Sequence, residues 1–272
     1  MSTLTTLEKR LDAVAGRLQP PATVGTPIEM AGRLGLELDD WQRDALSSDA
    51  RQLLLNVSRQ GGKSTVAAVL GLHEVLTKPN RRVLMVSPGE RQSKLLFATL
   101  MRYYKALGRP VAATTENLLS LQLANGSDVY ALPSDEDRIR GFAAVSLLLA
   151  DEASRISDGL MAAVRPMLAT TSGRIVAMST PNGPVGWWHT AWAEGGDDWL
   201  RYEVPATSIP RISPEFLERE RRALPRLIFD AEYRCQFTQA ADAVFSADDI
   251  NAALTPGLSG IRLFGGEDLH VA

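Results

Sequence analysis

Only one cysteine, Cys235, occurs in the chain, so the chain can form no internal disulfide and no zinc site made of several cysteines. A lone thiol suits a reducing compartment, and we expect it to be a small buried apolar residue. Histidines are also few: His73, His189 and His270 stand far apart and show no ligand spacing. We therefore expect packing or surface roles for them.

The chain also lacks an excess of either charge and lacks long apolar runs. Its 29 Lys and Arg residues stand against 32 Asp and Glu, a net charge of −3, so any DNA contact must be local. No run approaches the roughly 18 apolar residues of a membrane-spanning helix, and the N-terminus lacks a signal-peptide pattern. With 45% hydrophobic and 22% charged residues, the composition predicts a globular cytosolic protein.

Residues 53–69 combine an apolar run, a polar turn and a second apolar run, which predicts a strand, a loop and a helix. The turn ends in Gly61-Gly62-Lys63-Ser64. In phosphate-binding loops, backbone N–H groups at a helix start face the phosphates, a lysine reaches the β and γ oxygens, and a hydroxyl binds Mg²⁺. The usual pattern needs a further glycine at position 57, where this chain has Val57. This motif alone leaves a nucleotide-binding loop and a glycine turn capped by Ser64 both open.

A second strand, residues 145–150, ends in Asp151 and Glu152. Its continuous apolar character predicts a parallel strand buried on both faces, whose carboxyl end faces the ligand crevice of an open α/β sheet. There Asp151 could hold Mg²⁺ and Glu152 could orient or deprotonate a water molecule. The alternative, a helix cap at Asp151, is disfavoured by the pairing with Lys63-Ser64.

Two further motifs flank these elements. Trp41-Gln42 precedes the loop, and an amide beside an aromatic ring suits the edge and face of adenine, although an exposed glutamine beside a core tryptophan is the simpler interpretation. A strand at residues 174–179 leads into Ser179-Thr180-Pro181. The tryptophans at 187, 188 and 192 could stack on bases, but their helical spacing favours packing against the sheet.

The stretch Ser58-Arg59-Gln60-Gly61-Gly62-Lys63-Ser64-Thr65 resembles the variant phosphate loop, Arg-Gln-x-Gly-Lys-Ser/Thr, of the large terminase subunits of tailed bacteriophages. Asp-Glu and Ser-Thr-Pro follow in the family's order, and the resemblance spans residues 36–268. It implies an α/β fold, namely a P-loop NTPase of the ASCE or RecA-like type. A mostly parallel sheet would be flanked by helices and carry a small helical lid or linker subdomain.

The resemblance also implies a role for each matching residue. Lys63, Arg59 and Glu152 would be catalytic, and Ser64 and Asp151 would bind Mg²⁺. Arg140, with Arg138 in reserve, would reach the ATP of a neighbouring subunit. Coupling of hydrolysis to movement would fall to Ser179, Thr180 and Pro181. The expected ATP-binding residues are Trp41, Gln42, Ser58, Arg59, Gln60, Gly61, Gly62, Lys63, Ser64 and Thr65.

Four regions are expected on the same basis. They are an N-terminal helical arm (1–35), the P-loop ATPase core (36–207), a helical lid or linker subdomain (208–256), and the start of a truncated RNase H-like nuclease domain (257–272). Asp268 would be the first metal ligand of that nuclease, whose site is incomplete here because a two-metal nuclease needs several carboxylates from distant strands.

The resulting hypothesis is an ATPase motor that moves double-stranded DNA into a procapsid in the host cell cytoplasm, with ATP and Mg²⁺ as cofactors. The expected partners are the DNA, further copies in a ring expected to be a pentamer, the portal protein and the small terminase subunit, with no membrane involved. Two alternatives remain: a helicase-like DNA-dependent ATPase, which would need a second RecA-like domain, and a non-catalytic P-loop assembly subunit.

Overall fold

The computed structural model describes residues 24–135, 139 and 141–238, and all structural statements below refer to these residues. The chain divides into two compact units, Met1–Thr238 and Gln239–Ala272, and only the first contains described residues. None of the helices in these ranges is long and apolar enough to cross a membrane.

The described residues form an α/β unit. Its helices are α2 (Pro27–Arg33), α3 (Asp40–Ser47), α4 (Lys63–Thr77), α5 (Glu90–Ala106), α7 (Asp158–Val164), α8 (Gly186–Ala193), α9 (Pro214–Ala223) and α10 (Arg226–Arg234). Its strands are β1 (Gln52–Val57), β2 (Arg82–Ser87), β3 (Ala113–Glu116), β4 (Ser120–Leu123), β5 (Asp128–Pro133), β6 (Leu147–Asp151), β7 (Arg174–Ser179) and β8 (Leu200–Val204). The short 3₁₀ turns are η1 (Ala153–Arg155), η2 (Arg165–Leu168), η3 (Gly196–Asp198) and η4 (Ala206–Ser208).

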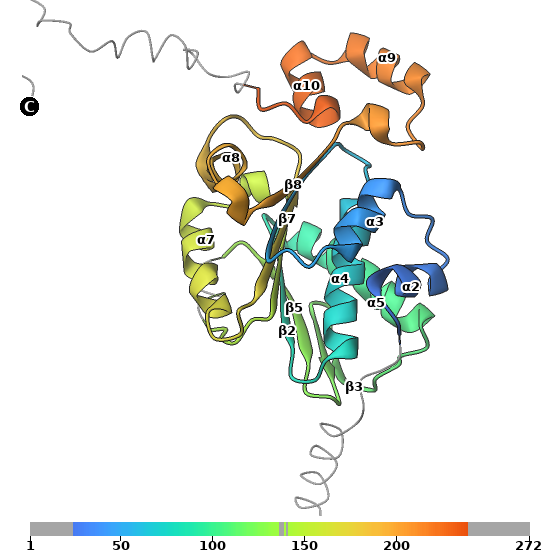
Figure 1. Cartoon of the computed structure of the whole chain (residues 1–272), viewed down its shortest axis with the longest axis vertical. Helices are drawn as coiled ribbons and strands as arrows, with labels where there is room; N and C mark the ends of the chain where they lie inside the picture. The colour runs from blue at the N-terminus through green and yellow to red at the C-terminus, as the bar shows by residue number, and fades with distance from the viewer. Residues whose placement is uncertain (1–23, 136–138, 140, 239–272) are drawn as a thin grey trace, which may run out of the picture. The chain divides into compact units, whose positions relative to one another are not determined.

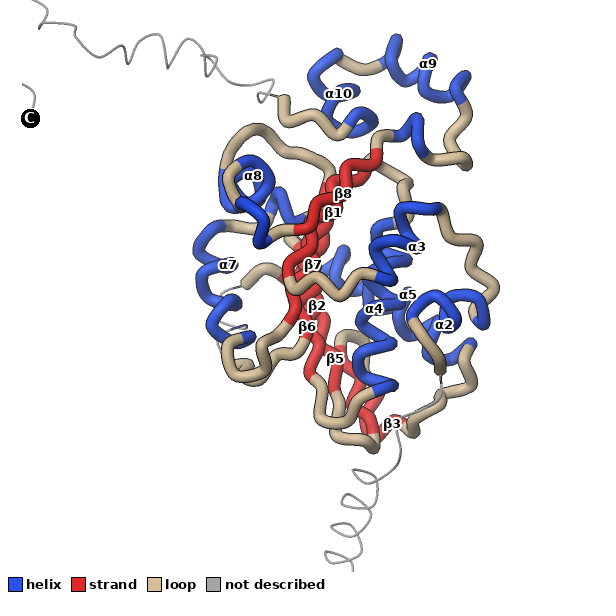
Figure 2. The backbone as a smooth tube through the Cα atoms, viewed as in Figure 1, coloured by secondary structure: helices blue, strands red, loops and turns tan. Residues whose placement is uncertain are grey.

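All the strands belong to one sheet, in the order β3-β4-β5-β2-β6-β7-β1-β8. From β5 to β8 every neighbouring pair is parallel, whereas β3 and β4 are antiparallel additions at one edge. Figure 2 shows these strands as one continuous layer between two layers of helices. The mostly parallel sheet predicted from the sequence is therefore confirmed.

Helices cover both faces of the sheet, which explains why its central strands are apolar throughout. In Figure 1, α2, α3, α4 and α5 lie on one face, and α7 and α8 lie on the other. Each face has its own hydrophobic cluster. Leu53, Leu55 and Met85 point into the first, and Leu54 and Leu84 into the second, as the alternation of a strand requires.

The segment from Val111 to Tyr130 is more elaborate than the sequence suggested. Two short strands around the Asn125-Gly126 turn were expected at an edge of the sheet, and β4 and β5 do meet there as an antiparallel pair. A third strand, β3, extends the edge. However, β5 also pairs in parallel with β2, so it belongs to the sheet interior.

Trp188 of α8 is a core residue, and the partly buried Trp187 and Trp192 pack against the same cluster, which confirms the interpretation based on helical spacing. Trp188 is 1% exposed and belongs to the cluster under α7 and α8. Its ring lies 6.0 Å from that of Trp187, edge to face, and 6.5 Å from that of Trp192. Base stacking by Trp188 is therefore excluded by its burial.

We predict that Trp188→Ala will lower the free energy of unfolding by about 3–5 kcal/mol, because removing a buried ring leaves a cavity. Urea unfolding followed by circular dichroism measures this loss. Leu118→Ala is the matched control, since Leu118 is 81% exposed and its removal should change stability by less than about 0.5 kcal/mol. Equal stabilities for the two variants would contradict the packing role of Trp188.

Candidate nucleotide-binding site

The expected motifs meet at the carboxyl ends of three adjacent strands. β7 lies between β1 and β6, with Asn56 opposite Ser179 and Asp151 opposite Met178. The loop after β1, the acids at the end of β6 and the hydroxyls at the end of β7 therefore share one edge of the sheet. Ligands of open parallel sheets bind at this edge.

The loop from Ser58 to Gly62 has a backbone that depends on its two glycines. Gly62 adopts the left-handed region, with φ of 93°, and a Cβ there would lie 2.4 Å from Nε2 of Gln42. A Cβ on Gly61 would lie 2.4 Å from Cγ1 of Val57. Gln60 is also left-handed, with φ of 58°. The loop thus closes tightly over Val57, and α4 begins immediately after it with no side chain capping its N-terminus. The first N–H groups of a helix have no partner within the helix, so this end is suited to an anion.

Lys63 lies buried beneath this loop, with 9% of its surface exposed. Its ammonium donates hydrogen bonds to the carbonyl oxygens of Val57 at 2.8 Å and Ser58 at 3.2 Å. Burial lowers the pKa of Lys63, and the carboxylates of Glu152 and Asp151 oppose that shift. The lysine is therefore held at the loop by groups that a phosphate oxygen could replace.

The two acids of β6 differ in environment. Asp151 is 8% exposed, and burial together with the neighbouring charge of Glu152 raises its pKa to about 6, while Lys63 acts in the opposite direction. Glu152 is partly exposed and left-handed, with φ of 49°, a conformation that costs free energy in a residue other than glycine. Glu152, not Asp151, precedes the following turn η1, so the helix-cap alternative for Asp151 is wrong.

The Ser179-Thr180-Pro181 segment is buried and is connected to the acidic loop. The hydroxyl oxygen of Ser179 accepts a hydrogen bond from the N–H of Ser154 at 3.2 Å and lies 2.7 Å from the Ser154 hydroxyl. Ser154 follows Glu152 by two residues. A change at the end of β7 would therefore reach the backbone that carries Glu152, a link that the sequence did not reveal.

Gln42 is buried, at 2% exposure, so the alternative of an exposed glutamine is wrong. Its side-chain oxygen accepts from the N–H of Asp39 at 2.9 Å, and its Nε2 donates to the carbonyl of Gly62 at 3.3 Å. Trp41 packs in the core and also lines a pocket of about 430 Å³ beside Asp39 and Pro210. Trp41 is therefore a packing residue at the wall of this pocket, and binding of adenine stays a prediction.

Residues from the end of the described chain also contact the loop. The N–H of Arg59 donates to the carbonyl of Glu232 in α10 at 3.0 Å, and the Arg59 guanidinium lies 2.8 Å from the Glu232 carboxylate. The buried amide of Asn56 donates to the carbonyl of Cys235 at 2.9 Å. Sequence reasoning missed these partners, although a polar Asn56 within an apolar strand was a signal.

Cys235 itself is buried, as expected, and burial raises the pKa of its thiol to about 12. A further missed residue is Arg211, whose guanidinium lies 2.6 Å from the carboxylate of Asp39 and 3.4 Å from the carbonyl of Gly61. Helix α3, the loop and the segment before α9 are thereby connected.

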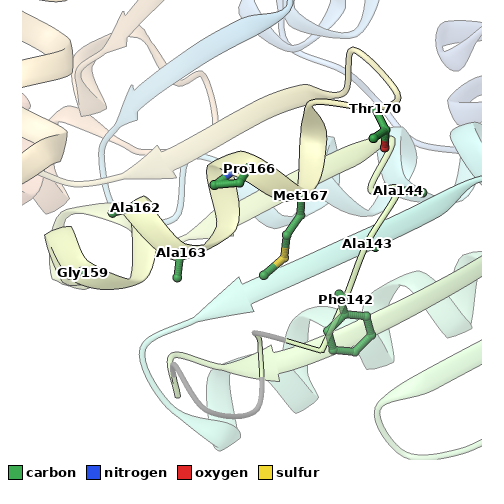
Figure 3. A pocket seen from close by; sticks show the side chains of 9 residues that line it. All are labelled: Phe142, Ala143, Ala144, Gly159, Ala162, Ala163, Pro166, Met167 and Thr170. Atoms are coloured by element: carbon green, nitrogen blue, oxygen red, sulfur yellow. The ribbon is translucent and has the colours of Figure 1, made fainter.

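Three predicted site residues, Arg138, Arg140 and Asp268, lie outside the described residues. A pocket of about 580 Å³, lined in part by residues 142–144, contains none of the described site residues (Figure 3). It is lined by Phe142, Ala143, Ala144, Gly159, Ala162, Ala163, Pro166, Met167 and Thr170. It has no charged group for a phosphate, so it is not the nucleotide site.

The residues present fit a magnesium ion bound together with a triphosphate. Nowhere in the described part of the chain do three or more His, Cys, Asp or Glu side chains form a group that could hold a metal ion. Mg²⁺, however, usually takes one or two protein oxygens and completes its shell with phosphates and water. The buried carboxylate of Asp151, destabilised without a cation, and the exposed hydroxyl of Ser64 are such oxygens.

A strand, a glycine loop with a buried lysine, and a strand ending in acids on a parallel sheet define a P-loop NTPase fold. Residues 54–252 match the family described as "Terminase large subunit, T4likevirus-type, N-terminal". The chain belongs to this family, and the resemblance noted from the phosphate loop is confirmed.

Individual relatives are similar over most of the chain. The terminase large subunit of Escherichia phage T5 is 29% identical over 223 residues, covering 78% of this chain and 49% of that protein. That of Thermus virus P23-45 is 24% identical over 254 residues, covering 79% and 52%. The chain thus spans about half the length of these relatives.

Solved structures agree on the fold. The large terminase ATPase domain of Thermus phage P74-26 has a TM-score of 0.69 at 19% identity, covering 76% of this chain and 97% of that one. The large terminase of another thermophilic bacteriophage, in complex with ADP, has a TM-score of 0.65 at 15% identity, covering 74% and 54%.

We predict that Asp151→Asn will stabilise the metal-free protein at neutral pH. The pKa of Asp151 is about 6 in the folded protein against 3.8 ordinarily, so folding binds a proton between these values and stability falls as pH rises through that window. Above pH 6 the buried charge of Asp151 lowers the free energy of unfolding by on the order of 3 kcal/mol, and the neutral amide of the variant avoids this loss. Urea unfolding with EDTA should show this gain near pH 7.5 and a smaller one near pH 5. A loss of stability at pH 7.5 would contradict the burial argument.

Proposed function

We propose that this chain is the ATP-hydrolysing motor domain of a viral terminase, which drives double-stranded DNA into a procapsid. The observation that carries the proposal is the meeting of Lys63, Asp151, Glu152 and Ser179 at one sheet edge, beside a glycine loop at a helix start. The family match and the named ATPase relatives support it.

In this proposal the triphosphate lies over the N–H groups of residues 60–65, and Gln42 lies near the adenine. Lys63 exchanges its carbonyl partners for β and γ oxygens, and Arg59 faces the γ-phosphate from the loop. Ser64 and Asp151 would hold the Mg²⁺, which would neutralise charge on the phosphates when bound. Glu152 orients the attacking water and accepts its proton, for which its partial exposure and its position next to Asp151 are suited.

Coupling of hydrolysis to movement would use two connections. Ser179, Thr180 and Pro181 would respond to loss of the γ-phosphate, and the hydrogen bonds to Ser154 would carry that response to the acidic loop. The second connection runs from the loop to α10 through Arg59 and Glu232. The lid helices α9 and α10 would then move relative to the nucleotide.

The complete protein would work as a ring of identical subunits, a pentamer, on the portal protein together with the small terminase subunit in the host cell cytoplasm. Its C-terminal half would hold the nuclease that begins near residue 257. A helicase-like ATPase is less well supported, because the family match over residues 54–252 is to terminase large subunits.

We predict that Glu152→Gln will bind ATP with affinity near that of the parent while turnover falls about 10²-fold or more, because the amide cannot accept the proton of water. Equilibrium binding of a fluorescent ATP analogue and phosphate release in the presence of duplex DNA measure the two quantities. Glu194→Gln, an exposed acid at the end of α8, is the control and should leave both unchanged. Parent-like turnover in Glu152→Gln would remove Glu152 as the base.

We also predict that Arg140→Ala and Lys63→Ala, each inactive alone, will restore turnover when mixed. A subunit with an intact loop but no arginine can use the Arg140 of a Lys63→Ala neighbour, an effect typically worth about 10³–10⁵ in rate. Phosphate release across mixing ratios should peak at an intermediate ratio. Arg138→Ala in place of Arg140→Ala tests the reserve residue. Inactivity of both arginine mixtures at every ratio would refute an arginine acting between subunits.

A further inference from the structure

A second polar cleft lies at the opposite edge of the sheet, where strands β1, β6 and β7 begin. Its volume is about 500 Å³, and α2, the end of α3 and the C-terminal half of α4 contribute to its wall. Strand β7 runs from this cleft, at Arg174, to the nucleotide edge, at Ser179, a rise of roughly 16 Å. The cleft is therefore separate from the phosphate loop.

Arg174 is the central feature of this cleft. Its Nε and Nη2 are buried and have no hydrogen-bond partner among the described residues. A guanidinium stays charged in proteins, so unpaired buried N–H groups are costly and call for a partner. Burial lowers the pKa of Arg174, and the negative charges of Glu74 and Asp49 oppose that shift. Both carboxylates act on Arg174 through their charge and not through a hydrogen bond.

The unpaired edge of Arg174 is the edge that other arginines of this chain use to bind a carboxylate with two hydrogen bonds. Nε and Nη2 of Arg82 donate to the two oxygens of Asp128 at 2.9 and 2.7 Å. The same two nitrogens of Arg221 donate to Glu218, both at 2.8 Å. Paired N–H groups of this kind fit the oxygens of a carboxylate or a phosphate.

The acids of the cleft wall do not fill this role. Glu74 is already engaged by two cations, with Lys78 at 3.1 Å and Arg81 at 3.6 Å. Asp49 acts on Arg174 only through its charge, since neither of the two unpaired nitrogens has a partner in the described part of the chain. The oxyanion that suits Arg174 must therefore come from outside the described residues.

The charges of the cleft indicate which oxyanion fits. Four lining side chains are cationic and two are anionic, so the lining carries two positive charges in excess. The cations are Arg51, Lys78, Arg81 and Arg174, and the anions are Asp49 and Glu74. A carboxylate would neutralise one charge, whereas a phosphate group carries about 1.5 to 2 negative charges at neutral pH.

We propose that this cleft is a second anion site, which binds a phosphate group through Nε and Nη2 of Arg174, with Arg51 and Arg81 at its rim. The phosphate belongs either to a small molecule or to the backbone of DNA, and both present two unesterified oxygens to this pair of nitrogens. A DNA phosphodiester carries only one negative charge, whereas a free phosphate or phosphate monoester carries about 1.5 to 2, so the charge balance of the cleft favours the small molecule. The site does not depend on ATP binding at the loop.

The test measures binding of inorganic phosphate by calorimetry in a Lys63→Ala background, which weakens phosphate binding at the loop. We expect Arg174→Met, which keeps the apolar stem, to weaken phosphate binding about tenfold or more, because it removes two charge-assisted hydrogen bonds. Arg51→Ala should weaken it less, since Arg51 is exposed at the rim. Arg102→Ala, an exposed arginine of α5 that does not line the cleft, is the control and should leave binding unchanged.

A second measurement identifies the source of the phosphate. Fluorescence anisotropy with a short DNA duplex should show weaker binding by Arg174→Met if the backbone of DNA is the ligand, and unchanged binding if a small phosphate compound is. If Arg174→Met has lost binding of inorganic phosphate, either anisotropy result supports the site. Undiminished phosphate binding by Arg174→Met, or none by the parent, would overturn it. ATP affinity of Arg174→Met with Lys63 intact should equal that of the parent, which verifies folding and separates this test from that of the motor.

Discussion

The burial of one positive charge, the ammonium of Lys63, constrains most of the nucleotide edge. A buried ammonium requires oxygen partners, and the loop supplies the carbonyls of Val57 and Ser58 only because glycines at 61 and 62 let it fold back over β1. The carboxylates at the end of β6 then provide the opposing charge. Asp151 in turn has an unfavourable buried charge of its own, which the ammonium of Lys63 partly compensates and the neighbouring charge of Glu152 makes worse.

Left-handed residues other than glycine occur on both sides of this charge cluster. Gln60 is in the loop and Glu152 follows β6, with φ of 58° and 49°. Such conformations cost about 1–3 kcal/mol each and persist where surrounding contacts determine them. For Glu152 these contacts include the double interaction of Ser154 with Ser179. Backbone strain is thus stored in the phosphate loop, at Gln60, and at Glu152, the proposed base.

Strands β1, β2, β6 and β7 could be predicted because a strand buried on both faces is apolar along its whole length, and the order of Lys63, Asp151 and Ser179 then placed them on one sheet edge. The pairing of β5 with β2 could not be predicted, because the alternating pattern of β5 fits an edge hairpin equally well. Contacts such as Asn56 with Cys235 span 179 residues, and no local pattern encodes them. From the sequence, Arg174 looked like an ordinary first residue of a strand. That two of its nitrogens lack a hydrogen-bond partner becomes visible only when the segments that line the cleft are brought together.

The amide of Asn56 connects strand β1 to the end of helix α10. Asn56 lies in a central strand and is fully buried. Its side-chain amide donates a hydrogen bond to the backbone carbonyl of Cys235, just after α10. The hydrogen bonding of β1 is therefore completed by a residue 179 positions further along the chain. A segment cut before residue 235 would leave the buried amide of Asn56 without its acceptor, so a unit that keeps this contact must extend through residue 235.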